Sequence, residues 1–266
     1  MKTNSTYTMI IGNILKWGEE IETRNSKVKR LTNINATFHD TPIVTVRKTA
    51  WKNALREMEW FLSGSQEIKD LDERVRHWWT PWVDTLGYVW HNYGKQFRRF
   101  EGANHNKVDQ IQYMIDTLRN HPYSRRNVIT TWNTADMVDG ITPITNCHGT
   151  VIQAFVRENK YLDLTMYQRS ADFMLGVQHN WIQYWALMHW LAHRADLEVG
   201  RLNWIGGDVH IYEAHFPVAQ KLADIPHNRE RVKFTYTPTS DEFKASDFTI
   251  EGIDEPVVTD KLEMIV

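Results

Sequence analysis

The feature that most constrains the fold is a long apolar segment that directly follows two strand-like runs. The runs over residues 148–156 and 162–167 predict a β-hairpin with its turn at residues 157–160. After them, large apolar side chains recur at helical spacing: Trp181, Tyr184, Trp185, Met188, Leu191 and Ala192. This spacing predicts a long, mostly buried helix. A buried helix next to paired strands indicates an α/β arrangement.

Helical and strand-like patterns alternate along the rest of the chain. Helical spacing runs over residues 9–17, 48–62, 109–119 and 213–222, and strand-like runs cover residues 33–38, 43–46, 127–132 and 203–212. Gly206 and Gly207 fall inside the last strand, where they predict a bulge or a close backbone approach. No internal repeat, low-complexity segment or linker interrupts this order, so we expect one α/β domain over residues 1–266.

The composition limits the classes of ligand. The chain is 42% apolar and 24% charged, as in ordinary soluble proteins, and its net charge is -2. This charge offers no basis for nucleic-acid binding, so a few local arginines would have to hold an anionic ligand. Apolar runs are too short for a membrane span, and the run Met9-Ile10-Ile11 ends at Gly12, too early for a secretory signal. We expect a cytoplasmic protein without nucleic-acid or membrane partners.

Cys147 is the only cysteine of the chain and has three possible roles. It could be a small buried apolar residue, an inert surface thiol or a nucleophile. A nucleophilic thiolate needs cationic or hydrogen-bond-donating groups nearby. His148 follows directly, and Arg169 stands across the predicted hairpin. These neighbours favour a nucleophile, although residue types alone leave the other two roles open.

Several motifs together resemble the thymidylate synthase family. They are Cys147-His148, the run Tyr167-Gln168-Arg169-Ser170-Ala171-Asp172, Leu175-Gly176, Asn180, and His210 with Tyr212. The resemblance extends to Arg24, Glu57 with Trp60-Phe61-Leu62, Trp79, Trp82, residues 93–96 and residues 124–126, and covers about residues 10–266. It implies that family's fold: a large mixed β-sheet flanked by helices, one long buried central helix, and a homodimer formed through the sheets.

The resemblance implies a one-carbon transfer to C5 of dUMP. Cys147 would add to C6 as a thiolate, which makes C5 electron-rich, and the cosubstrate 5,10-methylenetetrahydrofolate would supply the carbon. Glu57 would organise water and relay protons, and Tyr93 would help to remove the C5 proton. The other implied catalytic residues are Arg169, Asn180 and Asp172. No metal is expected, because the histidine pair His189 and His193 lacks a matching third ligand.

By the same resemblance, arginines from two chains bind the substrate phosphate. Arg24 and Arg169, with the Ser170 hydroxyl, would come from one chain, and Arg125 and Arg126 from its partner. This arrangement predicts an obligate homodimer with shared sites. The implied contacts to the deoxyribose hydroxyl are His210 and Tyr212. The implied folate contacts are Trp79, Trp82, Asp172 and Val266.

Asn180 indicates which pyrimidine is bound. A carboxamide can donate to a carbonyl and accept from an N–H, which matches O4 and N3–H of uracil. A carboxylate only accepts, which suits the amino group of cytosine, and the family's deoxycytidylate hydroxymethylases have Asp at the matching position. Asn180 therefore predicts dUMP as the substrate.

Two products remain possible, because both reactions share every step up to an exocyclic methylene at C5. Hydride from the folate then gives thymidylate, whereas water gives 5-hydroxymethyl-dUMP. Six residues are similar to phage hydroxymethylases, and the polar ones among them could aim a water: Glu59, Asn92, Asn146, Gln178, His179 and Trp204. We therefore expect a phage-type dUMP hydroxymethylase, in the host cytoplasm. The alternatives are a thymidylate synthase and a family member that binds nucleotide or RNA without turnover.

Overall fold

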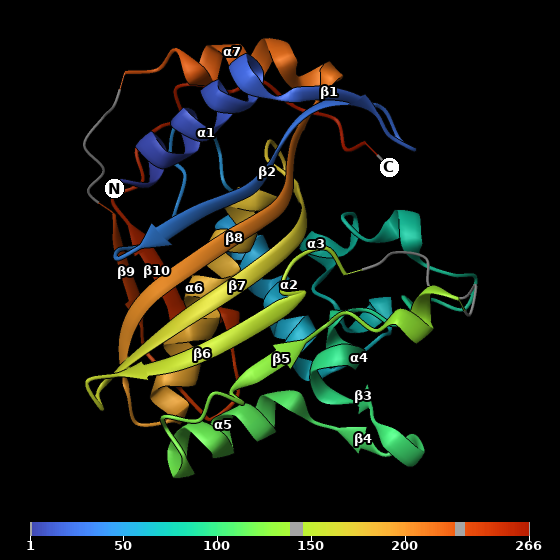
Figure 1. The fold of residues 1–266 in the computed structure, drawn as a ribbon, viewed down its shortest axis with the longest axis vertical. Coiled ribbons are helices and arrows are strands. Elements are labelled where there is room, and N and C mark those ends of the chain that lie inside the picture. The colour runs from blue at the N-terminus through green and yellow to red at the C-terminus, as the bar shows by residue number, and fades with distance from the viewer. Residues whose placement is uncertain (1, 139–145, 227–231, 266) are drawn as a thin grey trace.

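A six-stranded mixed β-sheet forms the centre of the computed structural model, which describes residues 2–138, 146–226 and 232–265 (Figure 1). The strands lie in the order β1-β2-β8-β7-β6-β5. Their bounds are β1 Glu19–Glu22, β2 Lys27–Phe38, β5 Val128–Thr130, β6 Val151–Arg157, β7 Tyr161–Asp172 and β8 Glu198–Tyr212. Neighbouring strands pair antiparallel except β7 and β8, which run parallel. The predicted hairpin is the pair β6–β7.

A single long helix joins the two parallel strands. Parallel neighbours need a crossover connection, and here it is α6 (Val177–Arg194), which contains the predicted apolar segment. Figure 1 shows α6 and α2 (Trp51–Ser63) behind the sheet. In the register of the pair, Gln168 lies opposite Gly206 and Asp172 opposite His210. Because α6 begins soon after β7 ends, its first turn lies at the same end of β7 and β8 as these polar residues.

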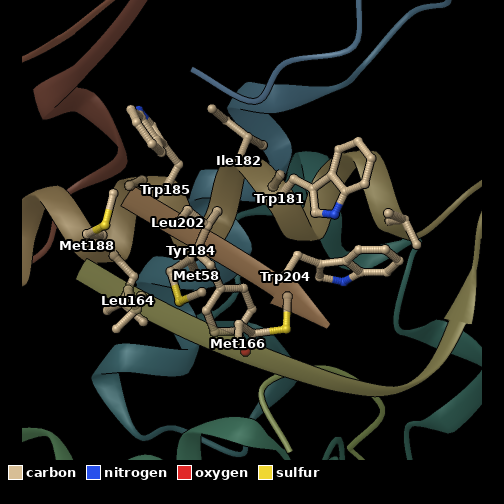
Figure 2. Close-up of a cluster of buried hydrophobic side chains, with 14 of the residues drawn as sticks. Met58, Leu164, Met166, Trp181, Ile182, Tyr184, Trp185, Met188, Leu202 and Trp204 are labelled. Atoms are coloured by element: carbon tan, nitrogen blue, oxygen red, sulfur yellow. The ribbon is translucent and has the colours of Figure 1, made fainter. Parts of the chain in front are cut away.

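Large aromatic and sulfur-containing side chains fill the space between α6 and the sheet (Figure 2). The rings of Trp181 on α6 and Trp204 on β8 meet edge to face, with centroids 5.5 Å apart. Around them lie further buried side chains: Met58, Leu164, Met166, Ile182, Tyr184, Met188 and Leu202. The long buried central helix and the α/β fold class predicted from the sequence are confirmed.

The remaining elements surround this core. The other helices are α1 Thr3–Trp17, α3 Glu73–Arg76, α4 Tyr93–Arg98, α5 Gln110–Asn120 and α7 Phe216–Ala223. Short 3-10 helices are η1 Ile68–Asp70, η2 Thr80–Trp82, η3 Ala103–His105, η4 Thr134–Met137, η5 Glu213–His215 and η6 Ala245–Asp247. Two small sheets pair β3 Phe100–Glu101 with β4 Lys107–Val108, and β9 Lys233–Tyr236 with β10 Phe248–Glu251. Helices α1 and α7 pack together at one end of the molecule (Figure 1).

The predicted strand at residues 43–46 is wrong. This segment is buried and has no strand partner in the sheet, because a side chain of α1 binds its backbone. The Asn4 Oδ1 atom accepts hydrogen bonds from the N–H groups of Thr45 at 2.9 Å and Val46 at 3.4 Å. The apolar pattern there reflects burial, not pairing within a sheet.

The face of the sheet that points away from α6 is not covered by any helix among the described residues (Figure 1). Alternate residues of a strand point to opposite faces. On β6, Ile152 and Ala154 are buried toward α6, whereas Val151 and Phe155 remain 40% and 43% exposed. In the described chain, no helix is both long and apolar enough to cross a membrane.

Truncation of one core methionine tests the central position of α6. Met188 is fully buried on α6, whereas Met9 on α1 is 43% exposed. Met188→Ala should lower the free energy of unfolding by about 2–5 kcal/mol, because it removes buried contacts and leaves a cavity. Met9→Ala is the matched control and should cost less than about 1 kcal/mol. Urea unfolding of both variants measures the difference, and equal losses would contradict the assigned core.

Candidate functional site

Cys147 lies in the loop that leads into β6, and the backbone of the sheet fixes its position. Its carbonyl oxygen accepts a hydrogen bond from the N–H of Ser170 on β7, at 3.5 Å. Two residues later, Gly149 has a φ of 57°. A Cβ atom at Gly149 would lie 1.9 Å from the Tyr184 hydroxyl oxygen, so only glycine fits there. The loop is therefore held tightly between β7 and α6.

The Tyr93 hydroxyl is a side-chain partner of the Cys147 thiol. The oxygen of Tyr93 lies 3.3 Å from Sγ of Cys147. The same oxygen accepts the backbone N–H groups of Cys147 at 2.9 Å and His148 at 3.4 Å. Both of its lone pairs are then occupied, so its own proton is left to point at the sulfur. Tyr93 is therefore placed to donate a hydrogen bond to a thiolate.

His148 is buried and does not supply a positive charge to the thiol. Its ring stacks on Tyr93 with centroids 4.2 Å apart, and its Nδ1 lies 3.0 Å from the Tyr184 hydroxyl. Burial lowers the pKa of His148 to about 3, so the ring is neutral at physiological pH. A neutral His148 brings no positive charge to the thiolate, and its ring packs against Tyr93.

Arg169 on β7 supplies the nearby positive charge. Its Nε donates to the carbonyl oxygen of Asn146 at 3.0 Å, and its guanidinium lies 4.9 Å from the ring centre of Trp132. Burial raises the pKa of the Cys147 thiol above its ordinary value, while the hydrogen bond from Tyr93 and the charge of Arg169 lower it. Burial is the largest of these effects, so the arginine moderates the pKa of Cys147 and does not bring it below its ordinary value.

Glu57 on α2 is a buried carboxyl group held by two donors. Its Oε1 accepts from the indole N–H of Trp79 at 2.5 Å, and its Oε2 accepts from Nε2 of Gln183 at 2.7 Å. Burial raises the pKa of Glu57 to about 7, and these two hydrogen bonds limit the rise. A carboxyl group with this pKa can both give and take a proton near neutral pH.

Asn180, in the first turn of α6, is bonded on both sides by glutamines. Its Oδ1 accepts from Nε2 of Gln168 on β7 at 2.9 Å, and its Nδ2 donates to Oε1 of Gln183 at 3.2 Å. Gln168 in turn accepts from the indole N–H of Trp204 at 3.0 Å. Hydrogen bonds therefore connect Asn180 to Glu57 through a single side chain, that of Gln183.

Gln183 was missed in the sequence, although a signal was present. It is a fully buried polar residue in an otherwise apolar part of α6. It stands three residues after Asn180, so both side chains lie on the same face of the helix. A lone amide at that spacing from a predicted binding residue indicates a functional contact.

His210, Tyr212 and Asp172 come together where β7 and β8 end. The Nδ1 atom of His210 lies 2.8 Å from Oδ1 of Asp208, and its ring meets Tyr212 edge to face at 5.2 Å. Asp172 pairs with His210 across the two strands. Its Oδ1 also accepts the N–H of Met174 at 2.9 Å, which shapes the turn into α6.

The predicted phosphate-binding arginines occupy different parts of the molecule. Arg24 is exposed in the turn between β1 and β2, and its Nε donates to Asn25 at 2.9 Å. Arg125 and Arg126 are exposed just before β5. Because Val128 lies opposite Gln153 and Thr130 opposite Val151, these two arginines enter β5 from the side that is away from Cys147. Within one chain, Arg169 and Ser170 are brought to Cys147, and Arg125 and Arg126 are not.

The predicted folate contacts are partly placed by the structure. Trp79 and Trp82 meet edge to face with centroids 5.9 Å apart, and Trp79 also binds Glu57. Trp82 is half-buried. Val266 lies outside the described residues. The described residues contain no group of three histidine, cysteine or acidic side chains that could hold a metal ion.

Several polar residues that suggested a bound water serve the backbone instead. Both ring nitrogens of His179 are used, by the Leu175 carbonyl oxygen at 2.8 Å and the Ala50 N–H at 3.1 Å. Glu59 is exposed and accepts the N–H of Ala245 at 2.9 Å. Neither side chain is thus directed at the Cys147 thiol.

Two further polar residues have similar structural roles. Asn92 caps the N-terminus of α4 by accepting the N–H of Lys95 at 3.0 Å, and its Nδ2 donates to Ser65. The amide nitrogen of Gln178 donates to the Met174 carbonyl oxygen at 3.2 Å. Asn92 therefore serves the backbone, whereas the Oε1 atom of Gln178 is buried and has no hydrogen-bond partner among the described residues.

Comparison with known proteins gives one consistent result. The thymidylate synthase family model matches residues 5–266. The chain is 36% identical to a thymidylate synthase of Corynebacterium aurimucosum, over 80% of this chain and 78% of that protein. It is 33% identical to a thymidylate synthase of Zymomonas mobilis, over 93% and 95% of the two chains. A thymidylate synthase of Buchnera aphidicola is 34% identical, over 79% of each.

The burial of Glu57 predicts a specific pH dependence of stability. Its pKa is raised from 4.5 to about 7, so the folded chain keeps a proton that the unfolded chain loses as the pH rises through 4.5. The stability that wild type has relative to Glu57→Gln should therefore fall by about 3 kcal/mol between these two pH values and stay constant above them. Urea unfolding of both proteins from pH 4 to pH 8 measures it. A difference that is independent of pH would show that the carboxyl group is not buried in this way.

Proposed function

The chain belongs to the thymidylate synthase family, a family of one-carbon transferases, and we propose that it methylates dUMP at C5 of the uracil ring. One observation carries this proposal. The Cys147 sulfur is held 3.3 Å from the Tyr93 hydroxyl, which already accepts two backbone N–H groups, and beside the charge of Arg169. Such an arrangement suits a thiolate that adds to an electron-poor carbon.

In the proposed reaction, the Cys147 thiolate forms a bond to C6 of uracil. The electron pair of the C5–C6 double bond then moves toward C5 and the O4 carbonyl, which makes C5 nucleophilic. Tyr93 would hold the thiolate by its hydrogen bond before the attack and after release of the product. The folate cosubstrate, 5,10-methylenetetrahydrofolate, supplies the one-carbon unit and the hydride that completes the methyl group.

Asn180 would recognise the uracil edge. One N–H of its carboxamide and one lone pair of its oxygen are used within the protein. One donor and one acceptor remain, which match O4 and N3–H of uracil. A donor at O4 would also stabilise the negative charge that develops there in the transition state.

Glu57 is the residue best suited to move protons in this site. Its pKa of about 7 allows it to relay a proton between water and the pyrimidine. Tyr93 is less suited to be the base for the C5 proton, because its oxygen already accepts two N–H groups and burial raises its pKa well above the ordinary value. We therefore propose Tyr93 as a hydrogen-bond donor to sulfur.

The phosphate and sugar would bind along β7 and β8. Arg169 and Ser170 lie beside Cys147, and His210 and Tyr212 lie at the next strand end, where they would bind the deoxyribose hydroxyl. Arg24 would approach from the turn before β2. Val28, near the start of β2, pairs with Tyr212, so this turn lies close to the end of β8. These groups would surround a nucleotide whose base reaches Asn180.

We also propose a homodimer through the open face of the sheet. Val151 and Phe155 expose apolar surface on that face, and Arg125 and Arg126 are exposed far from the Cys147 of their own chain. A partner chain would cover the apolar surface and bring its arginines to the phosphate. Planar guanidinium groups are well suited to bind a phosphate dianion.

The folate would lie beside Trp79 and Trp82, whose aromatic faces suit a flat ring system. Asp172 is a candidate for hydrogen bonds to its ring nitrogens. The indole N–H of Trp79 also binds Glu57, so the folate side of the site would be connected to the proton-relaying carboxyl group.

Methyl transfer is favoured over hydroxymethyl transfer, in contrast to the expectation from sequence. The relatives named above are called thymidylate synthases. In addition, His179 and Glu59 bind backbone groups. His179, Glu59 and Asn92 are thus used to hold helices and loops.

Product analysis tests the proposed reaction. The protein is incubated with dUMP and 5,10-methylenetetrahydrofolate, the nucleotide is identified by mass, and dihydrofolate is followed by absorbance. Thymidylate with one dihydrofolate per nucleotide is the expected result. A product heavier by one oxygen, without dihydrofolate, would establish hydroxymethylation instead. Product from dCMP but not from dUMP would contradict the role of Asn180.

Removal of the thiol tests the nucleophile. Cys147→Ala should lower kcat by at least about a thousandfold, because no other group can form the bond to C6. The Kd for dUMP should change by less than about tenfold, since the non-covalent contacts that bind dUMP do not depend on the thiol. Cys147→Ser serves as a conservative second variant. Turnover within about tenfold of wild type would remove Cys147 from this role.

A further inference from the structure

The hydrogen bonds around Asn180 all run in one direction. The indole N–H of Trp204 donates to Gln168, whose Nε2 donates to Asn180. Asn180 donates to Gln183, whose Nε2 donates to Oε2 of Glu57. Each amide accepts through its oxygen on one side and donates through its nitrogen on the other. We call these four bonds the donor chain.

Neither end of the donor chain can reverse. At one end, the indole nitrogen of Trp204 is a donor only. At the other end, the Ala54 carbonyl oxygen, an acceptor only, receives the second N–H of Gln183 Nε2 at 3.0 Å. A flipped Gln183 would place its oxygen against that carbonyl and against Glu57. The two fixed ends therefore determine the orientation of every amide between them.

Asn180 is the amide on which both ends act. If its carboxamide were flipped, its oxygen would face Oε1 of Gln183 and its nitrogen would face Nε2 of Gln168. Both contacts would be between like partners in a buried site, where an unmade hydrogen bond is costly. The free donor and the free acceptor of Asn180 therefore point in fixed directions before any nucleotide binds.

We infer that Gln183 is a positioning residue that orients Asn180 and thereby sets the preference for uracil over cytosine. This inference rests on the proposed function, in which Asn180 contacts the base. The same side chain holds Glu57, so base recognition and proton transfer share one amide. Gln183 is fully buried and would act through its bonds to Asn180 and Glu57, without contacting the substrate itself.

A purely structural role is the competing explanation, since a buried glutamine also satisfies backbone groups. Gln110 on α5 is the matched example: its Nε2 donates to two carbonyl oxygens, at 2.9 Å and 2.7 Å, and its Oε1 accepts from Thr130 at 3.1 Å. It has as many bonds as Gln183, but none of them involves Asn180 or Glu57. A structural role predicts the same result from both glutamines.

The test compares Gln183→Met with Gln110→Met, because methionine keeps the length of the side chain and removes its polar atoms. Calorimetric titration with dUMP and with dCMP gives the ratio of the two Kd values. We expect Gln183→Met to lower the preference for dUMP by about tenfold, the effect of one misdirected hydrogen bond. Gln110→Met should leave the ratio unchanged. Gln183→Leu replaces the first variant if that variant does not fold.

A second readout needs no nucleotide. Carboxyl carbon NMR of the free protein, assigned with Glu57→Gln, should show a higher pKa for Glu57 in Gln183→Met, because the donor to its ionised form is lost. An unchanged ratio of Kd values in Gln183→Met, with wild type preferring dUMP, overturns the inference alone. A wild type that does not prefer dUMP overturns the proposed function as well.

Discussion

The parallel pairing of β7 with β8 is the constraint on which the rest of the structure depends. It requires a long crossover, and α6 fills this role as the buried centre of the fold. The register also brings Gln168 beside Gly206, where a Cβ atom would lie 2.6 Å from the ring of Trp204. Glycine at this position leaves room for the indole, whose N–H donates to Gln168. Sheet topology thus sets the first bond of the donor chain.

Burial sets the chemistry of the groups that this pairing brings together. It keeps the ring of His148 neutral, raises the pKa of Glu57 to about 7 and raises the pKa of Cys147. The side chains that offset these effects are donors with fixed positions, such as Tyr93 toward sulfur. Donors that are already in position need little reorganisation when charge develops.

Much of the fold was predictable, because its signals are local. The spacing of apolar residues identified α6, and the alternation before it identified β6 and β7. The segment at residues 43–46 was mistaken for a strand, since the side chain of Asn4 satisfies its backbone from a distant part of the chain. Gln183 was overlooked for the same reason: its partners Ala54 and Glu57 lie on another helix.

In the site, too, some features could be predicted from local sequence and others depend on contacts between distant residues. Cys147, Arg169 and Asn180 were recognised as types that suit the chemistry. The structure bonds Arg169 to Asn146, the residue before Cys147, and Asn180 to Gln168, the residue before Arg169. The neutral state of His148 and the backbone bonds of His179 depend on packing, which no local pattern encodes. The family resemblance indicated the reaction class, whereas the direction of each hydrogen bond required the folded chain.

The one-way donor chain also limits how such a protein can change over evolutionary time. A carboxylate at position 180 would face the oxygen of Gln183, and Gln183 cannot turn because the Ala54 carbonyl oxygen holds its nitrogen. If Asn180 binds uracil as proposed, a lineage that moves from uracil to cytosine would have to change residues 180 and 183 together, or pass through an intermediate that binds both bases poorly. The hydrogen bonds between the buried amides would therefore make a change of substrate base by single substitutions unfavourable.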